Sequence, residues 1–303
     1  MSSDHSPIHD KTPYLHMLWA SMAFTLMATF SRWAGDYCDW RLIAFARASL
    51  ACLFAFLLAK AFKVQLVFWR PRILWMRSLA GSISMFCNFY ALAHLPVSDT
   101  LTLMNTAPIW VTLLSWLVFK QKPTTGIIFA VLTSFIGIIF IQQPHFQDGK
   151  FAILMAMIGA VTTSIAMLGL SRLQSVDPRA IVVHFSAVAS VSTLLLLLLT
   201  GPNDSFAPLH LPQAMSLLVL IGASGVLGQI GMTMAFAKGH ATRISVVALS
   251  QILFGLLVDL VLWKHALNWV SLFGMVLVIA PTAWILLGET PKESHDVVEA
   301  EMS

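Results

Sequence analysis

Two charged residues lie inside long apolar stretches, where an isolated charge is unfavourable. Arg47 is about six residues into the stretch 41–61, and Asp259 is five residues from the end of the stretch 241–264. With a rise of 1.5 Å per helical residue, both would lie roughly 10 Å from a helix end. Two opposite charges at this depth would form an ion pair inside the membrane, and binding of a proton or an ionic substrate would open this pair. The alternative is that Arg47 extends to the membrane surface and Asp259 faces water near it.

A group of polar and aromatic residues surrounds a proline in the first half of the chain. Pro108 removes one backbone donor from the stretch 97–120, so the carbonyl near Met104 loses its helical partner. A broken turn at mid-depth can hydrogen-bond a ligand or a water molecule. The candidate binding residues at this level are Asn88, Tyr90, Asn105, Thr106, Pro108 and Trp110. The alternative is a packing kink whose backbone groups are satisfied by neighbouring threonine side chains.

The second half contributes Gln229, Ser250 and Gln251 as candidate binding residues, each in the middle of an apolar stretch. A lone Gln can instead bond a neighbouring helix, a contact worth about 1 kcal/mol. His184 titrates near neutrality and would relay a proton, unless it is a packing residue with satisfied nitrogen atoms. Trp19 would line the predicted binding cavity, because an indole ring stacks on planar solutes.

The composition indicates which elements position these residues. The 303 residues are 58% hydrophobic and 11% charged, whereas soluble domains carry about 25% charged residues. The charges leave apolar stretches of about 20 residues, the length that crosses a hydrocarbon core of ~30 Å. Continuous apolar runs exclude the alternating strands of a barrel. We predict an all-α polytopic membrane protein with ten transmembrane helices at 14–34, 41–61, 72–94, 97–120, 124–142, 150–172, 179–200, 212–237, 241–264 and 268–288.

The distribution of Lys and Arg predicts the orientation, because cytoplasmic loops carry an excess of both. Thirteen of these residues lie on the side of the two termini and four on the other side. We therefore expect cytoplasmic tails at 1–13 and 289–303, in the inner (plasma) membrane. The basic cluster 60–77, which ends at Arg77, is interpreted as the strongest anchor, and a phospholipid-binding patch is the alternative.

The two halves of the chain resemble each other. A shift of 144 residues places Tyr90-Ala-Leu-Ala-His-Leu-Pro96 over Met234-Ala-Phe-Ala-Lys-Gly-His240. A shift of 138 places Asp39-Trp-Arg41 over Asp177-Pro-Arg179. Five helices per half is an odd number, so the halves must insert in opposite orientations. The sequence thus predicts two inverted five-helix repeats, at 14–142 and 150–288.

Several motifs resemble the EamA-type branch of the drug/metabolite transporter superfamily. They are Arg77-Ser-Leu-Ala-Gly81, Phe89-Tyr-Ala-Leu-Ala-His-Leu-Pro96, Asn105-Thr-Ala-Pro108 and Phe119-Lys-Gln-Lys122. Gln121 and Lys122 replace the Glu and Arg of the family pattern, and His265 and Ile252 depart from it in the second half. The resemblance implies a ten-helix carrier of amino acids, vitamins, nucleotide-like compounds or drugs.

We therefore expect a secondary transporter that moves a small organic solute across the bilayer by alternating access. The alternatives are a membrane-embedded enzyme acting on lipids and a channel. The sequence lacks the HExxH, GxSxG and P-loop patterns of common catalytic sites, so we expect no enzyme activity, no catalytic residue, no cofactor and no metal. The net charge of +4 lies at helix ends and not on a basic face, which argues against nucleic acid as a partner. We expect a monomer or a homodimer. The low charge of the predicted cavity favours a neutral, zwitterionic or aromatic solute.

Overall fold

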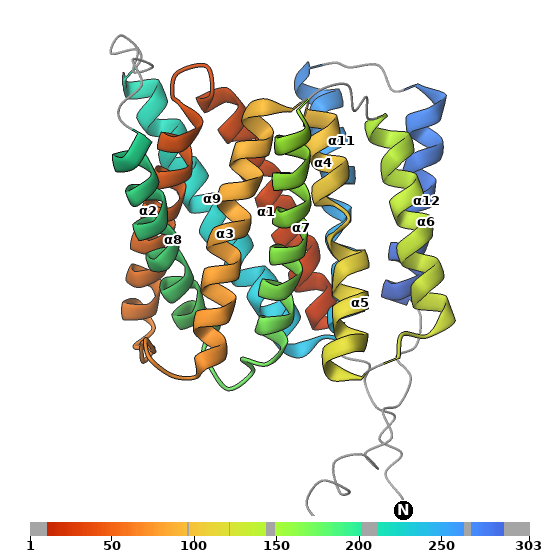
Figure 1. Cartoon of the computed structure of the whole chain (residues 1–303), viewed down its shortest axis with the longest axis horizontal. Helices are drawn as coiled ribbons and strands as arrows, with labels where there is room; N and C mark the ends of the chain where they lie inside the picture. The colour runs from red at the N-terminus through yellow and green to blue at the C-terminus, as the bar shows by residue number, and fades with distance from the viewer. Residues whose placement is uncertain are drawn as a thin grey trace, which may run out of the picture.

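The computed structural model describes residues 11–95, 97–120, 122–143, 149–200, 211–263 and 268–287, and every regular element in these ranges is helical (Figure 1). The helical regions begin and end within two residues of the predicted stretches, two of which are divided into shorter helices. The elements are α1 (Thr12–Ala34), α2 (Trp40–Ala61), α3 (Arg72–His94), α4 (Val97–Met104), α5 (Ala107–Phe119), α6 (Thr125–Gln142), α7 (Lys150–Ser171), α8 (Pro178–Thr200), α9 (Leu211–Lys238), α10 (Ala241–Ala248), α11 (Ser250–Val258), the π-helix η2 (Asp259–Trp263) and α12 (Trp269–Leu287).

The chain is a polytopic helical membrane protein. Within the described ranges, eight helical stretches are long and apolar enough to cross a bilayer, and α1 and α3 are the long helices outside this group. Both carry buried polar side chains, among them Ser21 and Thr25 on α1 and Arg77 and Ser78 on α3. Large apolar side chains such as Leu199 are exposed on other helices. The polarity of α1 and α3 is therefore directed into the bundle, where polar groups can find partners.

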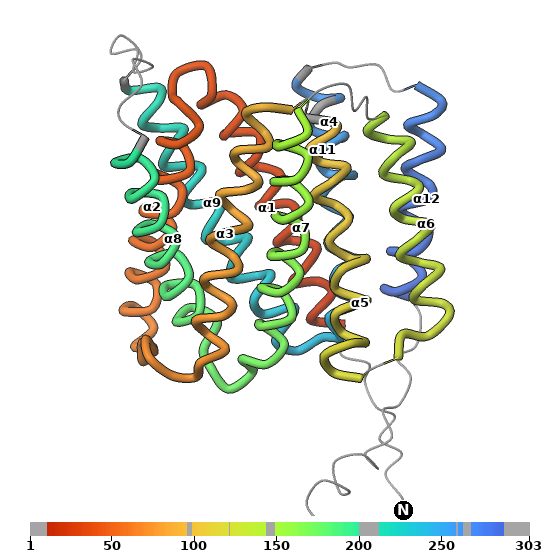
Figure 2. The backbone as a smooth tube through the Cα atoms, viewed as in Figure 1, coloured from red at the N-terminus to blue at the C-terminus, as the bar shows by residue number. Residues whose placement is uncertain are grey.

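Four helix pairs make the most extensive contacts, namely α1 with α9, α3 with α7, α2 with α8, and α6 with α12. In the view of Figure 2, α2 and α8 lie at one end of the bundle and α6 and α12 at the other. A stripe of glycines on α9 allows the close approach of its neighbours. Gly222 faces Leu50 of α2, whereas Gly228 and Gly231 face Phe24 and Trp19 of α1. Small residues of this kind are typical of tightly packed membrane helices.

Two of the predicted transmembrane helices are interrupted near their middle. The stretch 97–120 is divided into α4 and α5, and the stretch 241–264 into α10, α11 and η2. Pro108 explains the first break, because its ring cannot donate the helical hydrogen bond. The second break, at Leu249, has no proline, and hydroxyl groups of α1 stabilise it. Ser21 Oγ donates to the Ala248 carbonyl at 3.4 Å, and Thr25 Oγ1 donates to the Gln251 carbonyl at 3.2 Å.

Candidate functional site

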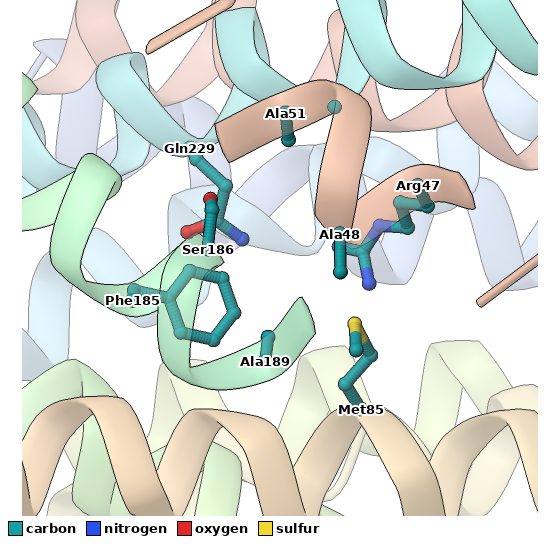
Figure 3. A pocket seen from close by; sticks show the side chains of 9 residues that line it. Arg47, Ala48, Ala51, Met85, Phe185, Ser186, Ala189 and Gln229 are labelled. Atoms are coloured by element: carbon teal, nitrogen blue, oxygen red, sulfur yellow. The ribbon is translucent and has the colours of Figure 1, made fainter. Parts of the chain in front are cut away.

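A small cavity of about 10 Å³ lies where four helices meet. A volume of roughly 10–15 Å³ holds a single water molecule, so the cavity is closed to any organic solute in this conformation. Figure 3 shows Arg47 and Gln229 on opposite sides of it. The cavity is lined by Arg47, Ala48 and Ala51 of α2, Met85 of α3, Phe185, Ser186 and Ala189 of α8, and Gly225 and Gln229 of α9.

The most unusual group beside this cavity is the guanidinium of Arg77 on α3, whose residue is only 1% exposed. Its Nη2 donates a hydrogen bond to Gln229 Oε1 at 2.8 Å. The guanidinium carbon lies 3.9 Å from the centroid of the Phe185 ring, a cation–π contact. Nε and Nη1 are buried and have no hydrogen-bond partner. Gly81 provides the space for this stack, since a Cβ there would lie 2.8 Å from the Phe185 ring and 3.1 Å from Arg77 Nη1.

Arg47 lines the cavity from α2, and its surroundings are also free of carboxylates among the residues described. Its Nε donates to Met27 Sδ at 3.0 Å, and its guanidinium carbon is 5.9 Å from the centroid of the Phe89 ring. A Cβ added at Gly225 of α9 would make an ordinary contact with Arg47, at 3.9 Å, and a tighter one with Met27 Sδ, at 3.3 Å. The side chain of Asp259 lies outside the described residues, so the predicted pair between Arg47 and Asp259 stays a prediction.

His184 joins α8 to α3 one residue away from the contact between Arg77 and Phe185. Its Nδ1 is 2.8 Å from Ser78 Oγ, and its Nε2 is 3.1 Å from the Phe68 carbonyl oxygen. A neutral imidazole that accepts at Nδ1 and donates from Nε2 satisfies both contacts. The His184 ring also packs edge-on against Trp75, with centroids 4.7 Å apart. These contacts fix how α3 and α8 align, and thereby position the Phe185 ring.

Side chains of the broken turn between α4 and α5 bond two backbone carbonyl groups at the end of α4. Asn105 Nδ2 donates to the Leu101 carbonyl, and Thr106 Oγ1 donates to the Leu103 carbonyl, both at 2.6 Å. Trp110 Nε1 donates in turn to Thr106 Oγ1 at 3.2 Å. The predicted residues of this turn thus contact one another, and none of them lines the cavity beside Arg47.

The two predicted binding residues of α3 contact residues of their own helix and of α7. Asn88 Nδ2 donates to Ser84 Oγ at 3.2 Å, and its buried Oδ1 has no partner. A Cβ at Gly159 of α7 would overlap this oxygen, so α3 and α7 approach each other closely at Asn88. Tyr90 stacks on His94 with ring centroids 4.0 Å apart. Neither residue lines the cavity.

In the second half, the structure brings Gln229 to the cavity but not Ser250 or Gln251. Ser250 is buried at the break between α10 and α11, and its hydroxyl has no hydrogen-bond partner. Gln251 contributes its backbone carbonyl to the contact with α1. Trp19 packs against Gly231 and is 38% exposed. In the described part of the chain, no three His, Cys, Asp or Glu side chains form a group that could hold a metal.

The residue that sequence reasoning missed is Arg77. Its interpretation as a surface anchor at the end of the basic cluster 60–77 is wrong, because it is buried inside the bundle between Gln229 and Phe185. An arginine near a helix end usually extends to the surface, so its position alone did not distinguish the two cases. The glycine one turn later, Gly81, is the signal that could have identified a buried side chain at this position.

A helical membrane bundle with two interrupted helices is typical of transport proteins. The model of the EamA-like transporter family matches residues 11–142 and 150–287. The chain therefore belongs to this family, which confirms the predicted membership of the drug/metabolite transporter superfamily.

The relatives of the chain include proteins described as transporters. It is 27% identical to the pseudopaline exporter CntI of Pseudomonas aeruginosa, over 93% of this chain and 98% of the relative. It is 26% identical to an uncharacterized transporter of Helicobacter pylori, over 91% of this chain and 95% of the relative. A solved crystal structure shares the fold with a TM-score of 0.77 at 15% identity, covering 91% of this chain and 98% of the other.

Proposed function

We propose that this protein is a secondary transporter that carries a small organic metabolite across the inner membrane by alternating access. Its membership of a transporter family supports the class of protein. The observation that carries the mechanism is the pair of interrupted helices, because α4 and α10 span Val97–Met104 and Ala241–Ala248, positions that differ by 144 residues at both ends. Discontinuous helices at equivalent positions of two repeats are typical of secondary transporters.

We infer ten transmembrane helices arranged as two inverted repeats, at 14–142 and 150–288. The repeat would make α1 equivalent to α7, α2 to α8, α3 to α9, and α6 to α12. The extensive pairs support this, since the repeat exchanges the pair α1/α9 with α7/α3 and maps α2/α8 and α6/α12 onto themselves. Asp39 and Asp177 support it further, because each accepts a hydrogen bond at 2.8 Å from the backbone amide two residues later. In Figure 1, α1 and α7 run in opposite directions.

The cavity at Arg47 and Gln229 is our candidate for the solute site, since α2 and α3 come from one half and α8 and α9 from the other. A site at the interface of two repeats is exposed to each side in turn when one half rocks against the other. In this proposal the cavity of about 10 Å³ represents a closed conformation. The breaks before Pro108 and at Leu249 act as hinges. The candidate residues around them stabilise the hinges and do not contact the solute.

We propose cytoplasmic termini and export as the physiological direction. The orientation rests on the excess of Lys and Arg at the helix ends nearest the termini, to which Lys60, Lys120, Arg172 and Lys238 contribute. Without Arg77, the side of the two termini still carries more Lys and Arg residues than the other side. The direction rests on the similarity to an exporter over nearly the full length of both chains.

Counterflow in proteoliposomes tests the proposal. Vesicles with the purified full-length protein are preloaded with an unlabelled metabolite mixture, and uptake of each labelled metabolite is followed over time. A carrier gives saturable uptake that the internal solute stimulates. Uptake that rises linearly with concentration and ignores the internal solute would indicate a channel, and chemical conversion of the solute would indicate an enzyme.

A further inference from the structure

We propose that the transported solute is an organic anion and that Arg77, together with Arg47, binds its carboxylate group. This inference rests on the transport function proposed above and adds the class of substrate to it. It departs from the neutral, zwitterionic or aromatic solute that the sequence favoured, because that expectation did not include the buried Arg77 behind the cavity wall.

The first observation is the charge of Arg77. A buried cation without a counter-ion is strongly unfavourable unless another group compensates it. The neutral amide of Gln229 and the face of Phe185 are the contacts of the Arg77 guanidinium, and Nε and Nη1 have none. By contrast, Arg41 at the start of α2 has an acidic partner, because it pairs with Asp39 at 2.8 Å. Within the ranges that the structure describes, no carboxylate is placed at Arg77.

The second observation is that Arg47 faces the same cavity. Phe185 and Gln229, the two groups that contact Arg77, line this cavity together with Arg47. Among the described side chains, which do not include that of Asp259, Arg47 forms no ion pair either. Its guanidinium group instead contacts the Met27 sulfur atom and the Phe89 ring. Arg47 lines the cavity, and Arg77 lies directly behind two of its lining groups, Phe185 and Gln229. The two cations repel each other, and an anion bound between them removes this repulsion while it satisfies the free donors.

The chemistry of the wall indicates a carboxylate on a carbon skeleton. Guanidinium groups match the planar geometry of a carboxylate and form short, charge-assisted hydrogen bonds with it. The rest of the wall is largely apolar, with Ala48, Met85 and Ala189 lining the cavity together with Arg47. Such a surface suits the hydrocarbon part of an organic acid better than a strongly hydrated inorganic ion. Opening of the closed cavity would supply the volume for this part.

The experiment compares acids with their neutral amides, using the purified full-length protein. The midpoint of thermal unfolding is measured with succinate and succinamide, with benzoate and benzamide, and with chloride and inorganic phosphate. We expect at least one carboxylate to raise the midpoint while its amide does not. The same acid is then expected to show saturable, exchange-stimulated flux in proteoliposomes.

Variants identify the residues that bind the acid. Arg77→Gln should weaken its binding roughly 10- to 100-fold, the effect of losing a charged hydrogen bond, and Arg77→Lys should restore part of it. Arg47→Gln provides a second variant if Arg77→Gln does not fold. Arg172→Gln is the matched control, because this exposed arginine also stacks on a ring, that of Phe119, at 4.2 Å. It should leave binding unchanged.

Three results would overturn the inference: equal binding of acids and amides, unchanged binding of the acid by Arg77→Gln, or stabilisation by chloride and phosphate with no carboxylate effect. The proposed transport function is judged separately. Saturable, exchange-stimulated flux of a neutral amide would support the transporter and contradict the anion inference. A failure of every metabolite in the counterflow experiment would contradict the transport function itself.

Discussion

Replacing Arg77 and its partner by apolar residues should abolish transport without destabilising the protein. In the double variant Arg77→Met with Gln229→Leu, both ends of the 2.8 Å hydrogen bond disappear, so neither partner is left unsatisfied. Removal of both partners of a buried hydrogen bond is often close to neutral. The variant also removes two buried nitrogen atoms without partners, each of which costs about 1–3 kcal/mol.

The magnitude follows from these contributions. Removing the two unsatisfied nitrogen atoms of Arg77 gains roughly 2–6 kcal/mol, and losing the cation–π contact with Phe185 costs about 2 kcal/mol. The double variant should therefore be between equally stable and about 4 kcal/mol more stable than the native protein, in line with other replacements of buried charges. The single variant Arg77→Met leaves Gln229 Oε1 without its donor and should be about 1–3 kcal/mol less stable than the double variant.

The assay is unfolding by SDS titration in mixed micelles, followed by far-UV circular dichroism, with transport measured on the same preparations. Arg172→Met serves as the control for loss of an exposed arginine on an aromatic ring, and it should change the free energy of unfolding by less than about 1 kcal/mol. A double variant more than about 2 kcal/mol less stable than the native protein would refute the reasoning, since Arg77 would then be a satisfied structural residue.

Three further substitutions test the packing around the site. Gly159→Val should destabilise the protein by about 1–3 kcal/mol through overpacking against α3. Gly255→Val is the control and should have a smaller effect, because no heavy atom lies within 4 Å of its added Cβ. Equal effects of the two variants on the SDS unfolding midpoint would contradict this prediction. Gly225→Leu should fill the cavity and abolish counterflow in folded protein, and normal flux would exclude the cavity as the solute site. Ser78→Ala removes the 2.8 Å contact with His184 Nδ1 and should cost about 1–3 kcal/mol in the same unfolding assay, a loss that would be absent if the imidazole had another partner.

The helical architecture could be predicted from the sequence because apolar length and charge position determine where helices begin and end in a membrane protein. The interruption at Pro108 was also predictable from the sequence, because proline removes a backbone donor whatever its surroundings. The interruption at Leu249 was not, because its cause is distant in sequence. Thr25 of α1 bonds the Gln251 carbonyl across 226 positions.

The candidate site was predictable only in part. Gln229 and Arg47 stood out as polar residues within apolar stretches, and the structure places both at one cavity. Arg77 did not, because its burial depends on the Phe185 ring and on the space left by Gly81. Asn88 stood out equally, but it contacts α7 at Gly159. A polar residue in a membrane helix therefore needs a partner. Only the packing between helices decides whether this partner is another protein group or a solute.

The most direct test of alternating access is the accessibility of the cavity from each side of the membrane. Ser186 lines the cavity and is buried, so Ser186→Cys is introduced after the native cysteines Cys38, Cys52 and Cys87 are replaced by alanine. A membrane-impermeant thiol reagent is then applied to right-side-out and to inside-out vesicles. The account predicts modification of Ser186→Cys from both sides and protection by a transported solute in both cases. Modification from one side only, or from neither, would contradict a site exposed alternately to the two sides.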